Sequence, residues 1–421
     1  MKVLIKQATI VAPSSPFNGK TKDIFIKDGI IQSIADIISE KADKIIEQLG
    51  LHVSIGWMDI FAHFCDPGFE YRETLETGAN AAAAGGFTDV IVIANTNPII
   101  HTKSQIEYII QKSASLPVTI HPTGAITKNA EGNELAEMYD MLEAGAIAFS
   151  DGIHSLQSPG ILLKALQYVL PFDGVIIQRP DDKTINAHGL VNEGIISTQL
   201  GLPAKPAIAE ELMIARDIEL VKYTNSKIHF SGISTKKSIE LITKAKAEGL
   251  KVTCSVTPYN LFFSDEDLTT YDTNLKVNPP LRTKEDVLAL CEALKKGVID
   301  SIASHHIPQN WDAKTCEFEY AKNGMIGLET LFGVVGSMVN SKWTINELVE
   351  ILSVLPRKIF SVSVPEIKEG AAAKLTLFNP EIEYIFDEAM IKSRSKNSAF
   401  IGKKLKGKVI GIINGKSSHF N

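Results

Sequence analysis

Histidine and aspartate side chains of this sequence lie where short apolar runs come to an end. His63, Asp151 and the adjacent pair His305 and His306 each close or directly follow such a run. Imidazole nitrogens and carboxylate oxygens are the donors that zinc accepts in proteins. Adjacent residues on a strand point to opposite faces, so at most one histidine of the pair faces the same side as the other candidates.

These apolar runs belong to a series of eight that alternates with helical stretches. The runs cover residues 55–60, 88–95, 117–124, 146–151, 174–179, 227–232, 251–256 and 298–304. This alternation is typical of an α/β protein with a (β/α)8 TIM barrel, in which chemistry lies at the C-terminal ends of the strands. An open doubly wound sheet is the alternative, but no GxGxxG motif follows the first strand, which disfavours a dinucleotide-binding version.

Both ends of the chain have a different pattern, in which apolar and polar residues alternate as in strands. The Asp28-Gly29 pair within residues 1–54 indicates a hairpin turn, and strand-like segments return after residue 366. We therefore expect a small β-sandwich domain built from residues 1–54 and 366–421, with the barrel over residues 55–365.

Composition excludes several classes of partner. The 421 residues are 44% hydrophobic and 22% charged, and 43 basic against 49 acidic residues give a net charge of −6. No block of lysines and arginines suggests a nucleic-acid or anionic-membrane partner, and no apolar run reaches the roughly 18 residues of a membrane span. The four cysteines form no CxxC pair, so neither a zinc knuckle nor a redox motif is indicated, and we expect a reducing, cytoplasmic setting.

The segment at 55–88, IGWMDIFAHFCDPGFEYRETLETGANAAAAGGFT, resembles the first barrel segment of dihydroorotases, which are cyclic amidohydrolases. The resemblance continues through ANTNP, AFSDG, LVNEG, LGLP, NPPLR and SKNSAFIGKKLKGKV, and so covers almost the whole chain. It implies a barrel with a β domain. It also implies zinc-dependent hydrolysis of dihydroorotate, or the reverse ring closure, in pyrimidine biosynthesis, where a zinc-held hydroxide attacks a polarised amide carbonyl.

The resemblance also shows where this sequence departs from the family's metal site. His63 and Asp151 match positions of retained ligands. Four further positions, where the family pattern implies three histidines and an aspartate that is both ligand and base, hold Phe61, Arg179, Gly232 and His305. His63, Asp151 and His305 therefore form an incomplete set of candidate metal ligands. His63 is otherwise a hydrogen-bonded buried histidine, and Asp151 the partner of a cation.

The implied substrate contacts are changed as well. The arginine that would pair with the substrate carboxylate is Cys65, either a reactive or a buried inert thiol, and a histidine after the eighth strand is Gln309. Cysteine cannot replace the bidentate clamp that an arginine makes. Asn95 and Asn278 still match substrate-binding asparagines, although each could instead hold its loop in place.

Three functions stay open. The first is a dihydroorotase-like pseudoenzyme that has no resident cofactor and serves a structural or regulatory role. Family analogy then suggests aspartate transcarbamoylase as a partner, and we expect a homo-oligomer because closed homo-oligomers are common. The second is an active dihydroorotase with an unusual site. The third is another amidohydrolase on the same barrel, with a single zinc held by His63, Asp151 and His305.

Arg179 and Asp151 should lie close together under the first of these functions. They end neighbouring barrel strands, which lie about 4.8 Å apart. A buried carboxylate that has lost its metal needs another positive charge. We therefore expect the guanidinium of Arg179 to pair with Asp151 at the barrel mouth.

Overall fold

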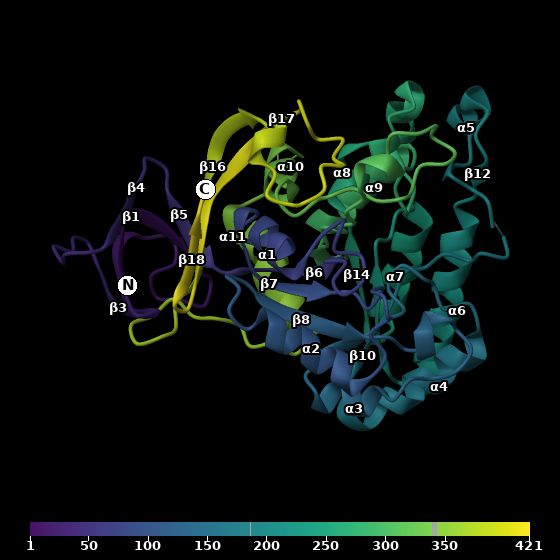
Figure 1. The fold of residues 1–421 in the computed structure, drawn as a ribbon, viewed down its shortest axis with the longest axis horizontal. Coiled ribbons are helices and arrows are strands. Elements are labelled where there is room, and N and C mark those ends of the chain that lie inside the picture. Colours follow the sequence, from purple (N-terminus) through teal and green to yellow (C-terminus); the bar gives the residue numbers. More distant parts are fainter. Residues whose placement is uncertain (186, 339–342) are drawn as a thin grey trace.

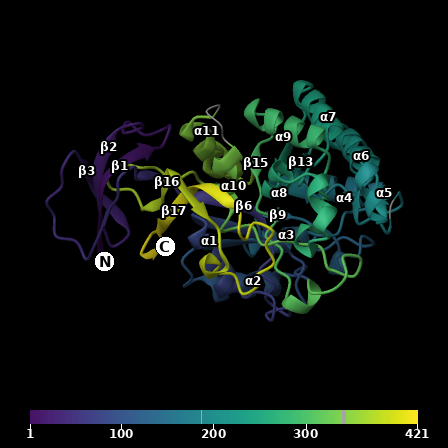
Figure 2. The same ribbon diagram turned by 90° about the horizontal axis from the view of Figure 1, so that it is seen from above.

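The chain folds into a barrel wrapped by helices and a second β-sheet that contains both termini (Figure 1). The computed structural model describes residues 1–185, 187–338 and 343–421. The view from above places the terminal sheet beside the barrel, with strands from both chain ends lying together (Figure 2). The expected α/β class, a TIM barrel with a β domain made from both termini, is confirmed.

The barrel consists of eight parallel strands in sequence order, and each corresponds to one of the eight apolar runs. The strands are β6 (Trp57–Ala62), β7 (Phe87–Val92), β8 (Thr119–Gly124), β9 (Ala148–Phe149), β10 (Val175–Gln178), β13 (Lys227–Ser231), β14 (Val252–Val256) and β15 (Ser301–Ile302). A bridge between Ala62 and His306 joins the first strand to the chain after the last, and the His63 N–H donates to the His306 carbonyl at 2.9 Å. The barrel is closed at its mouth by these contacts.

Helices lie between the barrel strands along the chain and also follow the last of them. They are α1 (Leu75–Ala84), α2 (Lys103–Ser113), α3 (Met138–Glu143), α4 (Pro159–Val169), α5 (Ile195–Leu200), α6 (Ile208–Thr224), α7 (Lys236–Ala247), α8 (Pro258–Phe262), α9 (Lys284–Lys295), α10 (Leu331–Met338), α11 (Ile345–Val349) and α12 (Leu355–Ile359). The hydroxyls of Thr74, Thr235 and Thr283 accept backbone N–H groups at the starts of α1, α7 and α9. Such N-caps satisfy donors that a helix leaves unpaired.

The terminal sheet also has eight strands, and it curls around its own apolar face. It contains β1 (Lys2–Val11), β2 (Thr21–Lys27), β3 (Ile30–Ala35), β4 (Lys44–Glu47), β5 (His52–Ile55), β16 (Lys374–Ile385), β17 (Lys404–Asn414) and β18 (Ser417–Phe420). Asp28 and Gly29, with φ of 51° and 81°, turn β2 into β3, which confirms the hairpin. β11 (Val191–Asn192) and β12 (Ala204–Lys205) form a separate parallel pair.

A buried ion cluster ties the N-terminal end of the barrel to the terminal sheet. Asp89 on β7 has no exposed side-chain surface. It accepts hydrogen bonds from Arg357 of α12, from Lys374 of β16 at 2.7 Å and from His121 of β8 at 2.9 Å. Burial raises the pKa of Asp89, but the hydrogen bond from His121 and the charges of Arg357 and Lys374 outweigh burial and lower it.

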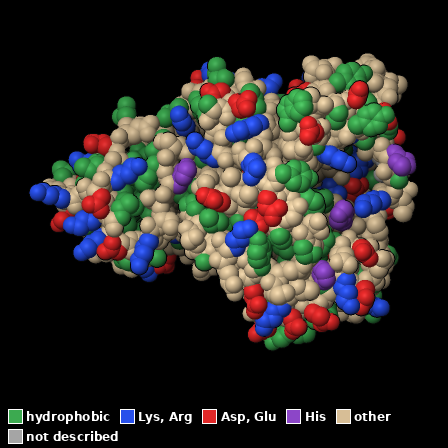
Figure 3. Space-filling model, viewed as in Figure 1, with side chains coloured by type: hydrophobic (Ala, Val, Ile, Leu, Met, Phe, Trp, Pro, Cys, Tyr) green, Lys and Arg blue, Asp and Glu red, His purple; other side chains and the backbone are tan. Residues whose placement is uncertain are grey.

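The surface mixes both signs of charge. On the face drawn in Figure 3, basic and acidic side chains are interspersed over both the sheet and the barrel. Within the part of the chain that the structure describes, no helix is both long enough and apolar enough to cross a bilayer.

Candidate functional site

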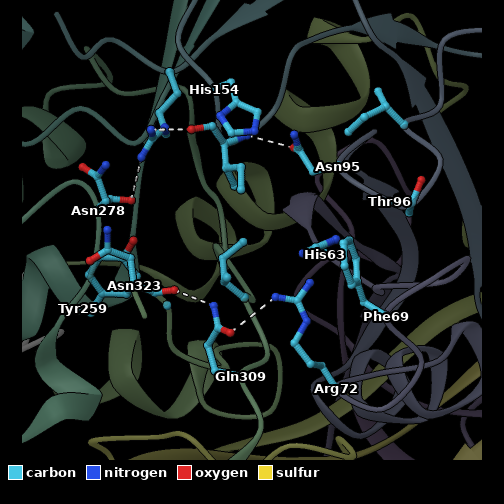
Figure 4. A pocket seen from close by; sticks show the side chains of 15 residues that line it. His63, Phe69, Arg72, Asn95, Thr96, His154, Tyr259, Asn278, Gln309 and Asn323 are labelled. Atoms are coloured by element: carbon cyan, nitrogen blue, oxygen red, sulfur yellow. Dashed lines mark hydrogen bonds between the residues drawn. The ribbon is translucent and has the colours of Figure 1, made fainter. Parts of the chain in front are cut away.

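A cavity of about 340 Å³ opens at the C-terminal ends of the barrel strands (Figure 4). We call it the barrel-mouth cavity. Its volume lies in the range of small-molecule sites. Its polar wall includes His63, Arg72, Asn95, His154, Arg179, Tyr259, Asn278 and Gln309, whereas none of its described lining residues is an aspartate or glutamate.

His305 lies beside the cavity and is held by protein contacts. Its ring stacks on Phe61, with centroids 4.2 Å apart, and its Nε2 is 2.9 Å from the Ser231 hydroxyl. Burial lowers the pKa of His305 to about 3, and the charge of Arg179 adds to the effect. A Cβ built on Gly232 would lie 2.7 Å from the His305 ring, so only glycine fits opposite this histidine.

His306 faces away from His305, as predicted, although both lie beyond the end of β15 and His305 has a φ of 43°. Its Nε2 is 3.3 Å from a carboxylate oxygen of Glu73, and its Nδ1 accepts the Gly327 N–H at 3.3 Å. Both ring nitrogens therefore have partners outside the barrel interior. His306 is a structural histidine that joins the last strand to the start of α1.

His63 lines the cavity and keeps one free ring nitrogen. Its side chain is buried, and its Nε2 has no hydrogen-bond partner. Burial and the nearby charge of Arg72 lower the pKa of His63 to about 3, while a hydrogen bond to the backbone of Asn95 opposes the shift. The ring is therefore neutral at physiological pH, and its free nitrogen can accept a hydrogen bond.

Asp151 is turned away from the cavity and bound by Thr127. One carboxylate oxygen accepts the Thr127 N–H at 3.0 Å and the other accepts the Thr127 hydroxyl at 2.6 Å. Burial raises the pKa of Asp151. Asn95 donates to the Asp151 carbonyl at 3.0 Å and accepts the Ile153 N–H at 2.9 Å, so its amide holds the loop after β9.

The prediction that Arg179 pairs with Asp151 is wrong. The nearest carboxylate to the Arg179 guanidinium is Asp181, 3.7 Å away, and the guanidinium also donates to the carbonyls of Ile153 and Asn278. Neighbouring strands fix the spacing of backbones but not the direction of side chains. Asp151 needs no cation because two donors of Thr127 already satisfy its carboxylate.

Arg179 belongs instead to a buried cluster with Asp181 and Lys205. The Lys205 ammonium lies 2.6 Å from Asp181 and 3.0 Å from the Asn278 side-chain oxygen, and the Asn278 amide donates to Asp181 at 3.2 Å. Burial lowers the pKa of Lys205 to about 8. Both polar atoms of the Asn278 side chain are therefore bonded within this cluster.

Arg72 is a cavity residue that sequence reasoning missed. Its guanidinium donates to Gln309 at 3.3 Å and lies over the Phe69 ring, 4.6 Å from the centroid. It is the only lysine or arginine between residues 55 and 88, which is the signal that could have found it. Cys65, by contrast, is buried, and burial raises the pKa of its thiol to about 12, so the thiol is inert.

The residues present do not fit a zinc ion. Within residues 1–185, 187–338 and 343–421, no three histidine, cysteine, aspartate or glutamate side chains are grouped to hold a metal. Of the three candidate ligands, Asp151 and His305 are bound to Thr127 and Ser231. His63 alone presents an unpartnered donor atom, and a zinc site needs three or four.

Solved structures of hydantoinases share this architecture. An L-hydantoinase (dihydropyrimidinase) from Arthrobacter aurescens superposes with a TM-score of 0.84 over 99% of this chain and 95% of that one, at 24% identity. A D-hydantoinase gives a TM-score of 0.81 over 100% of this chain and 95% of the other, at 21% identity. The chain thus shares its overall fold with these hydantoinases.

Sequence comparison places the chain more narrowly. The family model "Dihydro-orotase-like" matches residues 52–238. A dihydroorotase from Thermoanaerobacter sp. is 41% identical over 97% of this chain and 95% of its own length. A dihydroorotase from Syntrophus aciditrophicus is 37% identical over 97% of both chains. The chain belongs to the dihydroorotase family, which confirms the resemblance seen in its sequence.

Proposed function

We propose that this chain is a dihydroorotase-family protein of pyrimidine biosynthesis that does not carry out zinc-dependent ring opening and is retained for a structural or regulatory role. The observation that carries the proposal is the guanidinium of Arg179 at the barrel mouth. A guanidinium is always protonated and offers no lone pair to a metal. It places a positive charge where the family pattern implies a histidine ligand.

Neighbouring positions support the proposal through their donor chemistry. Phe61 and Gly232 offer no atom that could bind a metal, and His305 replaces the aspartate that the family pattern implies as general base. The lowered pKa of His305 leaves its ring neutral, but its Nε2 is engaged with Ser231. The mouth can bind and orient a ligand through its arginines, but its residues do not assemble a hydrolytic centre.

An active dihydroorotase is the second candidate, because relatives of that name are 37–41% identical over nearly the whole chain. A single-zinc amidohydrolase is the third. It would require Asp151 to leave Thr127 and His305 to leave Ser231, after which both could turn toward His63.

Metal content and turnover measured on one preparation separate these candidates. The protein is purified without chelator or added metal, zinc is determined by mass spectrometry, and both dihydroorotate and carbamoyl aspartate are offered as substrates. We expect well under one zinc per chain and no turnover. Bound zinc with a rate of order 1–1000 per second would overturn the proposal.

The proposed role also requires a partner, and family analogy suggests aspartate transcarbamoylase. A homo-oligomer of this chain would supply repeated docking faces, as closed symmetric assemblies do. Co-expression with the transcarbamoylase of the same organism followed by gel filtration and light scattering tests both points. We expect one joint species. Two separate monodisperse peaks at concentrations well above micromolar would contradict the partnership.

A further inference from the structure

We propose that a second cavity, at the junction of the barrel and the terminal sheet, binds a small planar aromatic acid. The ligand ring lies against the side chains of Phe332, Tyr384 and Phe386, and its acidic group contacts the ammonium groups of Lys392 and Lys408. We call this space the junction cavity. The inference is independent of the proposed function, because no described residue lines both this cavity and the barrel-mouth cavity.

The junction cavity has a volume of about 320 Å³, which lies at the lower end of the range for small-molecule sites. Its walls come from the end of α1, the start of α10, the strands β16 and β17, and the loop 386–392 between those strands. α10 packs against β17, and both lie beside β16 (Figure 1). The cavity therefore forms only where the terminal sheet is docked on the barrel.

Aromatic side chains form the apolar wall of the junction cavity. Phe332 and Phe386 are both buried. The ring of Phe332 is held by Trp57 and Phe378, with ring centroids 4.7 and 5.2 Å away. Aromatic pairs gain energy beyond the area that they bury, so rings fixed in this way favour a planar aromatic ligand over an aliphatic one.

The hydroxyl of the half-buried Tyr384 has no hydrogen-bond partner among the described residues. A Cβ built on Gly333, which also lines the cavity, would clash with this hydroxyl, so the oxygen lies at the cavity wall. Burial alone raises the pKa of Tyr384 to about 12, and the hydroxyl therefore stays protonated at physiological pH. An acceptor atom of a ligand would satisfy this unpaired donor.

The charged groups of the wall favour an acid over an amine. Neither Lys392 nor Lys408 forms an ion pair with a described residue, and the Lys408 ammonium lies 5.9 Å from the centroid of the Tyr384 ring. The two carboxylates of the wall, Glu329 and Asp387, each accept two backbone N–H groups at 2.9 to 3.2 Å. An incoming carboxylate thus meets unpaired ammonium donors, whereas an incoming ammonium would compete with backbone donors for its partners.

Isothermal titration calorimetry of the full chain with naphthoate tests the proposal. Each of three comparison ligands changes one property: naphthamide lacks the charge, cyclohexanecarboxylate lacks the aromatic ring, and naphthylmethylamine reverses the charge. We expect one naphthoate per chain, and binding at least roughly tenfold weaker for each comparison ligand, because either the charge-assisted contact or the ring contact is lost. Equal or tighter binding of the amine would overturn the assignment of an acid.

Substitutions place the ligand in the junction cavity. Lys392→Gln and Lys408→Gln should each weaken naphthoate binding, and the double variant should weaken it roughly tenfold or more. Tyr384→Phe removes only the hydroxyl and should weaken binding roughly threefold. Lys164→Gln removes the same charge from an exposed position on α4 and should leave binding unchanged. Circular dichroism verifies that each variant is folded.

A variant of the barrel mouth separates the two cavities. Arg179→Met should leave naphthoate binding unchanged, because Arg179 lines only the barrel-mouth cavity. Three results would overturn the inference: no naphthoate binding at millimolar concentration, equal affinity in the wild type and the folded Lys392→Gln, Lys408→Gln double variant, or loss of binding in Arg179→Met. Naphthoate has no cyclic amide, so the measurement does not depend on turnover of dihydroorotate.

Discussion

The two ends of the barrel differ in how their buried arginines are paired with carboxylates. At the N-terminal end, Asp89 is surrounded by Arg357, Lys374 and His121, and both of its oxygens are bonded. At the mouth, Arg179 lies 3.7 Å from Asp181, which Lys205 approaches more closely, and the guanidinium of Arg72 donates to the neutral Gln309. The Nε of Arg357 is unpartnered, as are those of Arg72 and Arg179. The two ends therefore differ in how closely an arginine is paired with a carboxylate, and an unpartnered Nε alone does not distinguish a structural role from a binding role.

The largest expected effect is at the N-terminal end of the barrel. Arg357→Met should lower the free energy of unfolding by about 3 kcal/mol, because it leaves the fully buried Asp89 with fewer charge partners. Urea denaturation followed by circular dichroism measures the loss. A loss below about 1 kcal/mol would contradict the view that the cluster is a structural element.

A smaller effect is expected from the neutral histidine at the mouth. The pKa of His305 is about 3 in the folded protein against 6.5 for an ordinary histidine. Between these values the unfolded chain binds a proton that the folded chain does not, so stability falls as pH drops below about 6.5. His305→Gln should therefore lose about 2 kcal/mol less than the wild type between pH 7 and pH 5.

Denaturation midpoints at the two pH values give this difference directly. The exposed His188 provides the matched control, since His188→Gln should leave the pH dependence of the wild type unchanged. An unaltered pH dependence in His305→Gln would show that His305 does not stay neutral in the folded protein.

Arg179→Met should have a still smaller effect on stability, of about 1 kcal/mol. The guanidinium has a single carboxylate neighbour at 3.7 Å, and Asp181 keeps its closer contact with Lys205 after the substitution. The comparison with Arg357→Met in the same denaturation experiment is the sharpest test of the contrast between the two ends. Equal losses for the two variants would remove that contrast.

For Phe61→His we expect no effect on activity at all. Phe61→His restores one imidazole at the mouth but should not produce turnover of dihydroorotate with or without added zinc, because Arg179 and Gly232 still provide no ligand. An assay for carbamoyl aspartate measures the turnover, with an active dihydroorotase as the positive control. A zinc-dependent rate in this variant would indicate that the mouth is one substitution away from catalysis.

Much of the fold was predictable from the sequence because it follows from local patterns. Apolar runs bounded by helical stretches predicted all eight barrel strands. The Asp28-Gly29 pair predicted the hairpin, because both residues tolerate the left-handed backbone that the turn requires. Strand length was less predictable. β9 and β15 have only two paired residues each, because pairing depends on the neighbouring strand and not on the apolar run itself.

Little of the site was predictable from strand geometry. His305 and His306 point to different parts of the molecule, as predicted, but strand alternation is not the cause, because β15 ends at Ile302 and His305 has a φ of 43°. The partner of Arg179 depends on side-chain rotamers and on the loop that carries Asp181, and neither can be read from strand order. Arg72 reaches the cavity from the loop before α1, so its role depends on a loop path that no periodicity encodes.

The close approach of Gly232 to His305 limits how this site could change. Any side chain at position 232 would meet the His305 ring at 2.7 Å, and the residue also has a φ of 74° that favours glycine. A histidine introduced at position 232 would therefore clash with the present His305 ring and would require a change at position 305 as well.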